Sequence, residues 1–151
     1  MAAAGVVAVG STGRAADAED IVARHRVAEA LLAARLVAVA EQAGMSPEEI
    51  NAVLKDVVAR SAVDGFWITD ETGRAYLASE DLELTFVSNP EEQPQASAFW
   101  PLIEGAEDIV IQDARRREID DRAFKYVGVA GVDKPRIVQV GVGAEHLPQR
   151  E

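Results

Sequence analysis

The last third of the chain, residues 108–142, carries the strongest secondary-structure pattern in the sequence. Three segments rich in Val and Ile, at residues 108–113, 123–131 and 136–142, are separated by short stretches that contain Gly, Asp or Pro. Such segments are typical of β-strands, and short turns join consecutive antiparallel strands. The sequence therefore predicts a three-stranded antiparallel sheet. Because this sheet is so apolar, earlier segments of the chain must cover it.

Two helices are predicted before the sheet. Residues 15–43 are dominated by Ala, Leu, Glu and Arg, which are strong helix formers, and Gly44 follows them as a C-cap. Ser46 and Pro47 form a typical helix start, and we expect this second helix to end near Ser61.

The first predicted helix carries an apolar stripe that is wider than a single contact requires. The stripe consists of Ile21, Ala28, Leu32, Leu36 and Val39, and it is widened by Val27, Leu31 and Ala34. A broad apolar face on a long helix often binds a second partner. We therefore predict a homodimer through this helix, or its continuation into a bundle. The alternative is a helix that packs only on its own sheet.

A β-hairpin is predicted at residues 64–77, where Gly73 supplies the positive φ that the turn needs. Alternation along its first strand places Phe66 and Ile68 on one face of the sheet and Trp67 on the other.

Between this hairpin and the last three strands lies a loop-rich insertion. Residues 80–95 are predicted as a loop, with room for a short strand at residues 82–87, and residues 97–104 as a short helix or turn. The predicted fold class is thus α+β, with five strands and helices. An insertion of this kind folds over one face of a single sheet and leaves a cleft beneath it.

Bulk composition excludes several classes of protein. The 151 residues suit one domain, and a formal net charge of -11 argues against binding nucleic acid, because phosphate backbones would be repelled. Without cysteine, the chain has neither disulfides nor thiolate chemistry. Residues 1–14 are predicted to be a disordered start or the truncated, membrane-proximal end of a membrane helix. Residues 15–143 would form the domain, and residues 144–151 an exit tail.

Two segments resemble the Cache family, the extracytoplasmic relatives of PAS domains. Residues 64–73, DGFWITDETG, are similar to the opening hairpin of Cache domains. Residues 115–120 and 124–131 resemble the late strands of single Cache domains in bacterial receptors. The resemblance extends over residues 22–142. Where the family pattern would have Asp-Gly at the late hairpin turn, this chain has Asp-Asp.

The resemblance implies a PAS-like, five-stranded antiparallel sheet with a long N-terminal helix and a loop and short-helix insertion over one face. It also implies a sensory input domain of a membrane-anchored histidine kinase, chemotaxis receptor or cyclic-dinucleotide enzyme. Such a domain lies outside the membrane, on the periplasmic or cell-surface side, and binds a small molecule between sheet and inserted loops. A cytoplasmic location is the alternative. The competing function is a PAS-like dimerisation or interaction module without a small-molecule ligand.

No catalytic, nucleotide-binding or metal-binding motif is recognisable. His25 and His146 have no nucleophile or carboxylate at a recognisable spacing. Asp113, Asp120 and Asp121 could approach a cation together, yet no calcium-loop pattern is present. We therefore predict a protein that is not an enzyme and that needs neither metal nor cofactor.

A ligand site is predicted where the insertion meets the sheet. Five aromatic residues are expected there: Trp67, Tyr76, Phe99, Trp100 and Tyr126. Lys125 lies either on a solvated outer face or against an anionic ligand group, and Arg116 could serve the same end if its turn folds back. The arginine run at residues 115–117 is otherwise predicted to be a solvated turn. One cation among several aromatic residues would suit a carboxylate ligand.

Overall fold

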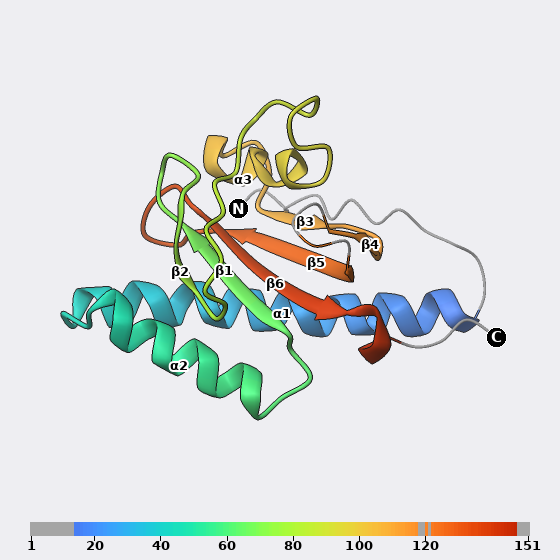
Figure 1. Ribbon diagram of the computed structural model, residues 1–151, viewed down its shortest axis with the longest axis horizontal. Coiled ribbons are helices and arrows are strands. Elements are labelled where there is room, and N and C mark those ends of the chain that lie inside the picture. The colour runs from blue at the N-terminus through green and yellow to red at the C-terminus, as the bar shows by residue number, and fades with distance from the viewer. Residues whose placement is uncertain (1–13, 118–119, 121, 148–151) are drawn as a thin grey trace, which may run out of the picture.

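A single antiparallel sheet organises the computed structural model, which describes residues 14–117, Asp120 and residues 122–147. The helices and strands are α1 (Arg14–Gln42), α2 (Pro47–Ala59), β1 (Gly65–Thr69), β2 (Ala75–Ala78), η1 (Ala96–Phe99), α3 (Pro101–Glu104), β3 (Ile109–Ile111), β4 (Arg115–Arg116), β5 (Ala123–Ala130), β6 (Ile137–Gly143) and η2 (Ala144–His146). Figure 1 shows α1 and α2 on one face of the sheet, and α3 with its flanking loops on the other. The predicted α+β class is confirmed.

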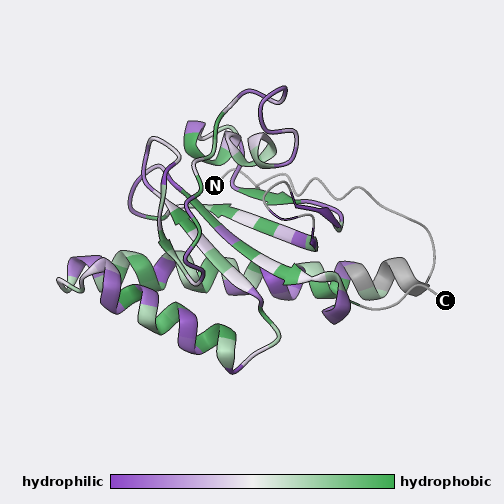
Figure 2. Ribbon diagram, in the orientation of Figure 1, coloured by the Kyte–Doolittle hydropathy of each residue, from purple (hydrophilic) through white to green (hydrophobic). Residues whose placement is uncertain are grey.

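The sheet has six strands in the described part of the chain, in the order β2-β1-β6-β5-β3, with β4 also paired to β5. The three predicted late strands are confirmed as β3, β5 and β6, all antiparallel. The prediction of five strands is wrong by one, because Arg115 and Arg116 form β4 rather than a turn. Figure 2 shows the change from hydrophobic β3 to hydrophilic β4. Exposed arginine side chains are compatible with strand pairing at the edge of a sheet.

Both predicted helices are confirmed, and each begins and ends within two residues of its predicted bounds. Ser46 caps α2, and its Oγ accepts a hydrogen bond of 3.2 Å from the backbone N–H of Glu49. Gly44 ends the turn after α1 with a φ of 85°, and Gly73 has a φ of 91° in the β1–β2 turn. These glycines adopt a backbone conformation that other residues rarely reach.

Small residues of α1 face the sheet, and its large residues face solvent. The buried positions are Ala23, Ala30, Ala33, Ala34, Val37 and Ala40. Leu32 is 70% exposed, Val39 64% and Ile21 56%, so most of the predicted apolar stripe lies away from the sheet. Small side chains let the helix approach the sheet closely, which leaves the larger apolar residues available for another contact.

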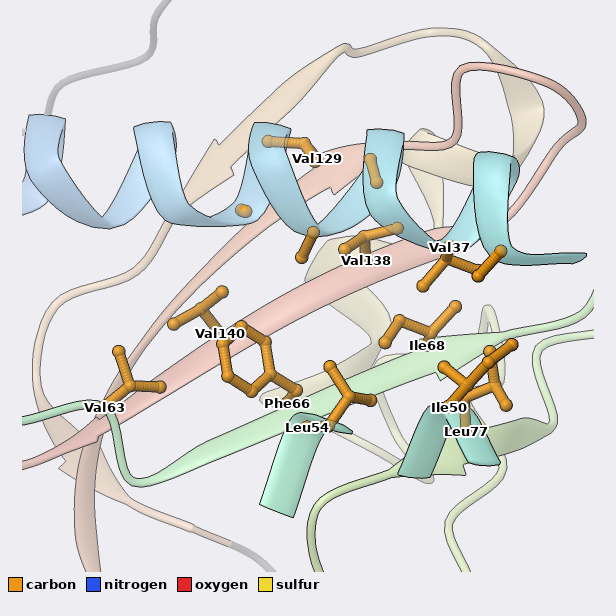
Figure 3. Close-up of a cluster of buried hydrophobic side chains, with 14 residues drawn as sticks. Val37, Ile50, Leu54, Val63, Phe66, Ile68, Leu77, Val129, Val138 and Val140 are labelled. Atoms are coloured by element: carbon orange, nitrogen blue, oxygen red, sulfur yellow. The ribbon is translucent and has the colours of Figure 1, made fainter. Parts of the chain in front are cut away.

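The two faces of the sheet belong to two separate hydrophobic clusters. The helix-side cluster consists of Ala30, Ala33, Ala34, Val37, Ala40, Ile50, Leu54, Val63, Phe66, Ile68, Leu77, Val129, Val138 and Val140. Figure 3 shows Phe66, Ile68, Val138 and Val140 of the sheet together with Val37, Ile50 and Leu54 of the two helices. The loop-side cluster consists of Trp67, Phe86, Phe99, Leu102, Phe124, Tyr126 and Ile137. Alternation in β1 therefore separates Phe66 and Ile68 from Trp67, as predicted.

The start of α1 and the short helix η2 lie toward the same end of the long axis of the molecule (Figure 1). His146 of η2 also interacts electrostatically with Arg26 of α1. Within the described residues, no helix combines the length and the apolar character that crossing a bilayer requires.

Candidate functional site

A cavity of about 30 Å³ lies between the loop side of the sheet and the insertion. It is lined by Leu84, Phe86, Gln95, Ala96, Arg117, Tyr126 and Gln139. Tyr126 and Gln139 come from the neighbouring strands β5 and β6, and Ala96 begins η1. A site needs roughly 10–15 Å³ to hold one water molecule, so this cavity can accept a small polar guest.

Aromatic rings lie directly on glycine backbone beside the cavity. A methyl group at Gly141 would be 2.7 Å from Cε1 of Tyr126 and 3.0 Å from Cζ3 of Trp67. A methyl group at Gly128 would be 2.6 Å from Cδ1 of Phe99. These positions need glycine because no room remains between ring and strand.

The rings also contact one another. Trp67 and Tyr126 pack edge to face with their centroids 5.7 Å apart, and Tyr126 stacks on Phe124 at 5.6 Å. Phe86 and Phe99 form a second edge-to-face pair at 6.3 Å. Contacts of this geometry add to the stability that apolar burial provides. Phe86 and Tyr126 line the cavity, and Trp67, Phe99 and Phe124 pack against them.

Arg117 is the buried charge of this site, with a side chain only 2% exposed. Its Nε donates a 2.5 Å hydrogen bond to Oδ1 of Asp120, and its Nη2 bonds Oδ2 of the same carboxylate. Nη1 lies 3.5 Å from Oε1 of Glu80, and the guanidinium covers the ring of Phe124 at 4.3 Å. It also shares a hydrogen bond with the hydroxyl of Tyr126.

The charges around Arg117 perturb one another. Burial alone would lower the pKa of the guanidinium, but the hydrogen bonds to Asp120 and Tyr126 outweigh it and the pKa is raised. The hydrogen bond from Arg117 lowers the pKa of Asp120 to about 2. Burial raises the pKa of Tyr126, although Arg117 opposes this effect. At neutral pH, Arg117 and Asp120 are therefore a charged pair next to a neutral phenol.

Two buried polar atoms on the loop side have no hydrogen-bond partner within the described residues: Nε1 of Trp67 and Oε1 of Gln112. Trp67 pairs in register with Gln139, which lines the cavity, and the backbone N–H of Gln112 bonds the carbonyl of Tyr126. An unsatisfied buried donor or acceptor costs about 1–3 kcal/mol. This face of the sheet therefore holds two atoms with unused hydrogen-bonding capacity, on residues that do not themselves line the cavity.

The structure brings four of the predicted site residues together. Trp67, Phe99 and Tyr126 belong to the loop-side cluster, and Trp100 packs against it. Tyr126 also lines the cavity. Arg116 is exposed on β4, whereas its neighbour Arg117 is buried at the cavity. Consecutive residues of an extended segment point in opposite directions, so Arg117, which the sequence interpretation did not select as a ligand residue, is the one of the two arginines that lines the cavity.

Tyr76 and Lys125 lie on the helix side, away from the cavity. A β-bulge pairs Ile68 with Leu77 and Thr69 with Ala75, which leaves Tyr76 as the extra residue and turns it to the opposite face. Lys125 shares its register with Val142 and its face with Val129, and it is only 6% exposed. The interpretation of Lys125 as a solvated residue is therefore wrong, and it does not line the cavity either.

A second buried arginine, Arg136, was missed by the sequence interpretation. Its Nη1 donates to Oε1 of Glu41 at 2.6 Å and to the hydroxyl of Tyr76 at 2.7 Å, and its Nη2 donates to Asp133. Tyr76 in turn donates to Glu41, and burial together with this bond raises the pKa of Tyr76 to about 12. The cluster joins α1, β2 and the β5–β6 turn.

Polar residues inside apolar strands were the available signal for these missed positions. Arg136 begins and Gln139 interrupts the otherwise apolar segment RIVQVGV, and a buried polar residue requires a partner or a cavity. Leu84, Gln95 and Ala96 came from the insertion, where no periodicity marks which side chains point inward.

Asp64, Glu145 and His146 place one potential metal-ligand atom each within 4.8 Å of one another. Oδ2 of Asp64 already accepts a 2.6 Å hydrogen bond from the N–H of Gly143 and lies 2.7 Å from Nδ1 of His146. These contacts connect the start of β1 to the end of β6 without an ion, and we assign no metal to the group.

No protein-family model matches the chain, and no curated protein sequence matches it. The candidate site therefore rests on its own geometry.

Proposed function

We propose that the chain is a PAS-like sensory input domain of the single Cache type, which binds a small molecule in the loop-side cavity. The main support for ligand binding is the cavity itself. It lies between an antiparallel sheet and a loop-rich insertion and is lined by apolar and polar side chains. Two helices, a hairpin, the insertion and four further strands follow one another along the chain, one strand more than the family resemblance implies. Unpaired polar atoms on the same face support a guest that forms hydrogen bonds.

A route from the cavity to the end of the domain supports a signalling role. Gln139 lines the cavity in β6, and the same strand continues through Gly143 into η2. There, Asp64 binds both Gly143 and His146. A shift of β6 on ligand binding would thus move η2, which lies toward the same end of the molecule as the start of α1 (Figure 1).

Because the start of α1 and η2 lie toward the same end, this arrangement suits a domain attached to a membrane at that end. We propose an extracytoplasmic location within a larger signalling protein, with the cytoplasm as the alternative. Its output would be that of a histidine kinase, a chemotaxis receptor or a cyclic-dinucleotide enzyme.

Filling the cavity tests the proposal. Ala96 lines the cavity in η1, whereas Ala98 of the same short helix is exposed, so Ala98→Leu is a matched control for Ala96→Leu. A library of small polar metabolites is screened by thermal shift, because a ligand that binds the native state raises the melting temperature. We expect at least one compound to stabilise the wild type and Ala98→Leu but not Ala96→Leu. A library without any stabilising compound, or equal stabilisation of all three proteins, would contradict ligand binding in this cavity.

The exposed face of α1 favours a second role, which is compatible with the first: association of two copies. Leu32, Val39 and Ile21 are each more than half exposed on one stripe of the helix. We propose a homodimer through this stripe. If no ligand is found, a dimerisation or interaction module remains the alternative function.

Sedimentation velocity of Leu32→Glu tests the dimer. Ala52→Glu, at an exposed position of α2, introduces the same charge and serves as the control. We expect the wild type and Ala52→Glu to sediment as dimers and Leu32→Glu as a monomer. A monomeric wild type at high concentration would exclude this dimer.

A further inference from the structure

Arg117 lines the cavity, yet it already holds a carboxylate of its own chain. Asp120 takes both the Nε and the Nη2 bonds, which is the planar two-bond geometry that a guanidinium offers to any carboxylate. The cavity wall therefore contains a guanidinium that could bind a carboxylate ligand, but Asp120 of the same chain already occupies it.

The two partners differ in their freedom to move. The side chain of Arg117 is 2% exposed and lies between the ring of Phe124 and the hydroxyl of Tyr126. The side chain of Asp120 is 35% exposed. If the pair separates, Asp120 can therefore turn into water, whereas Arg117 stays at the cavity wall.

The local charge balance decides how an anion could enter. Asp120 and Glu80 both face Arg117, and Arg122 lies 5.0 Å over the ring of Phe124, with its backbone N–H bonded to Oδ1 of Asp120. A guest carboxylate that takes the two-bond position on Arg117 must therefore replace Asp120. Asp120 occupies the two-bond position, whereas Glu80 makes a single contact of 3.5 Å.

We propose that Asp120 is an internal competitor for a short carboxylate ligand, which binds Arg117 in place of Asp120. This inference rests on the proposed ligand-binding function and names its ligand class. Leu84, Phe86 and Ala96 would surround the apolar part of the ligand, and the cavity of about 30 Å³ restricts that part to very few carbon atoms.

Competition from Asp120 should weaken the binding of a free carboxylate by an amount that can be measured. A carboxylate tethered three residues from Arg117 acts at a high effective concentration, so the wild type binds a free carboxylate weakly. Removing the charge of Asp120 removes the competitor. Asp120→Asn should therefore bind acetate at least about tenfold more tightly than the wild type.

The experiment titrates sodium acetate, at constant ionic strength, into the wild type, Asp120→Asn and Asp113→Asn, and follows binding by NMR of backbone amides and the Arg117 Nε–H. Asp113 is an exposed residue of the preceding segment, so Asp113→Asn gives the same change in net charge. Acetamide, which has the shape of acetate without its charge, is titrated in parallel. We expect tighter acetate binding in Asp120→Asn alone, and weaker binding of acetamide in all three proteins.

Equal acetate affinities in the three proteins, or equal affinities for acetate and acetamide, would overturn the proposal. Should Asp120→Asn fail to fold, the wild type decides: acetate must shift the Arg117 Nε–H resonance at a lower concentration than acetamide does. The failure of this inference differs from that of the proposed function. If compounds other than carboxylates stabilise the wild type but not Ala96→Leu, the cavity still binds a ligand and only the carboxylate class is wrong. If no compound binds, both the proposed function and the ligand class are wrong.

Discussion

The two faces of the sheet are built from alternate residues of the same strands, and they differ in kind. On the helix side, aliphatic residues such as Ile68 and Val138 are fully buried against α1 and α2. On the loop side, aromatic rings rest on glycine backbone beside a cavity, and the indole N–H of Trp67 lacks a partner within the described residues. One face is thus a close-packed support, and the other leaves space and hydrogen-bonding capacity for a guest.

The two buried arginines, one on each face of the sheet, also differ in how their partners are arranged along the chain. Arg136, on the helix side, is bound by Glu41, Asp133 and Tyr76, which come from three separate parts of the chain. Arg117, on the loop side, depends chiefly on Asp120, three residues away. A network between distant elements stabilises the fold, whereas a local pair can exchange its partner without unfolding the chain.

Removing Arg136 should have the largest effect on stability. Arg136→Met leaves Glu41 and Asp133 without their cation, and breaking a buried ion pair by removing one partner costs roughly 3–5 kcal/mol. Arg60→Met is the control, because Arg60 is 78% exposed in a surface pair with Asp56 that should contribute about 1 kcal/mol or less. Urea denaturation measures both. A cost below about 1 kcal/mol for Arg136→Met would show that the cluster does not stabilise the helix side.

Equivalent leucine truncations on the two faces should differ next. Leu77 is fully buried in the helix-side cluster, so Leu77→Ala should cost about 2–5 kcal/mol. Leu84 is only partly buried and borders the cavity, so Leu84→Ala should cost roughly 1 kcal/mol. Equal losses in urea denaturation would remove the proposed contrast in packing.

Adding a methyl group to the loop side should have a moderate effect. In Gly128→Ala, the new Cβ would be 2.6 Å from Cδ1 of Phe99, and overpacking of this kind costs about 1–3 kcal/mol. Phe99→Leu should relieve part of this strain, so the double variant should be less destabilised than the sum of the single variants. Strict additivity would mean that Phe99 does not lie on Gly128.

The contact of His146 with Asp64 should give the smallest and most pH-dependent effect. The hydrogen bond to Asp64 raises the pKa of His146, so its contribution to stability is complete below the unfolded-state pKa near 6.5. It is lost as pH rises through the higher folded-state pKa. We expect the stability difference between the wild type and His146→Gln to shrink from pH 6 to pH 8, and Asp64→Asn to lower the pKa of His146 in an NMR titration. An unchanged pKa in Asp64→Asn would contradict this contact.

Local signals predicted much of the fold. Ser46, Gly44 and Gly73 marked boundaries because capping and positive φ depend on one or two residues, and alternation assigned Phe66 and Trp67 to opposite faces. Such patterns are readable in a sequence because their causes lie within a few residues.

Features that depend on distant parts of the chain were not predictable in this way. The bulge that turns Tyr76 toward Glu41 follows from pairing with β1, and simple alternation gives the opposite face. The apolar stripe of α1 was identified from the sequence. The contact of the sheet with alanines such as Ala30 was not, because it depends on how closely the helix and the sheet approach each other. Arg117 was passed over for Arg116 because only the folded β4 distinguishes them.

The bond between Arg136 and Glu41 joins residues 95 positions apart in the chain. Bringing such distant residues together has a large entropic cost, so we expect this bond to form only after β6 has paired with β1. An interaction that is absent from the folding transition state slows unfolding without accelerating folding. Arg136 would then act mainly on the lifetime of the native state, and its loss would shorten that lifetime while leaving the refolding rate almost unchanged.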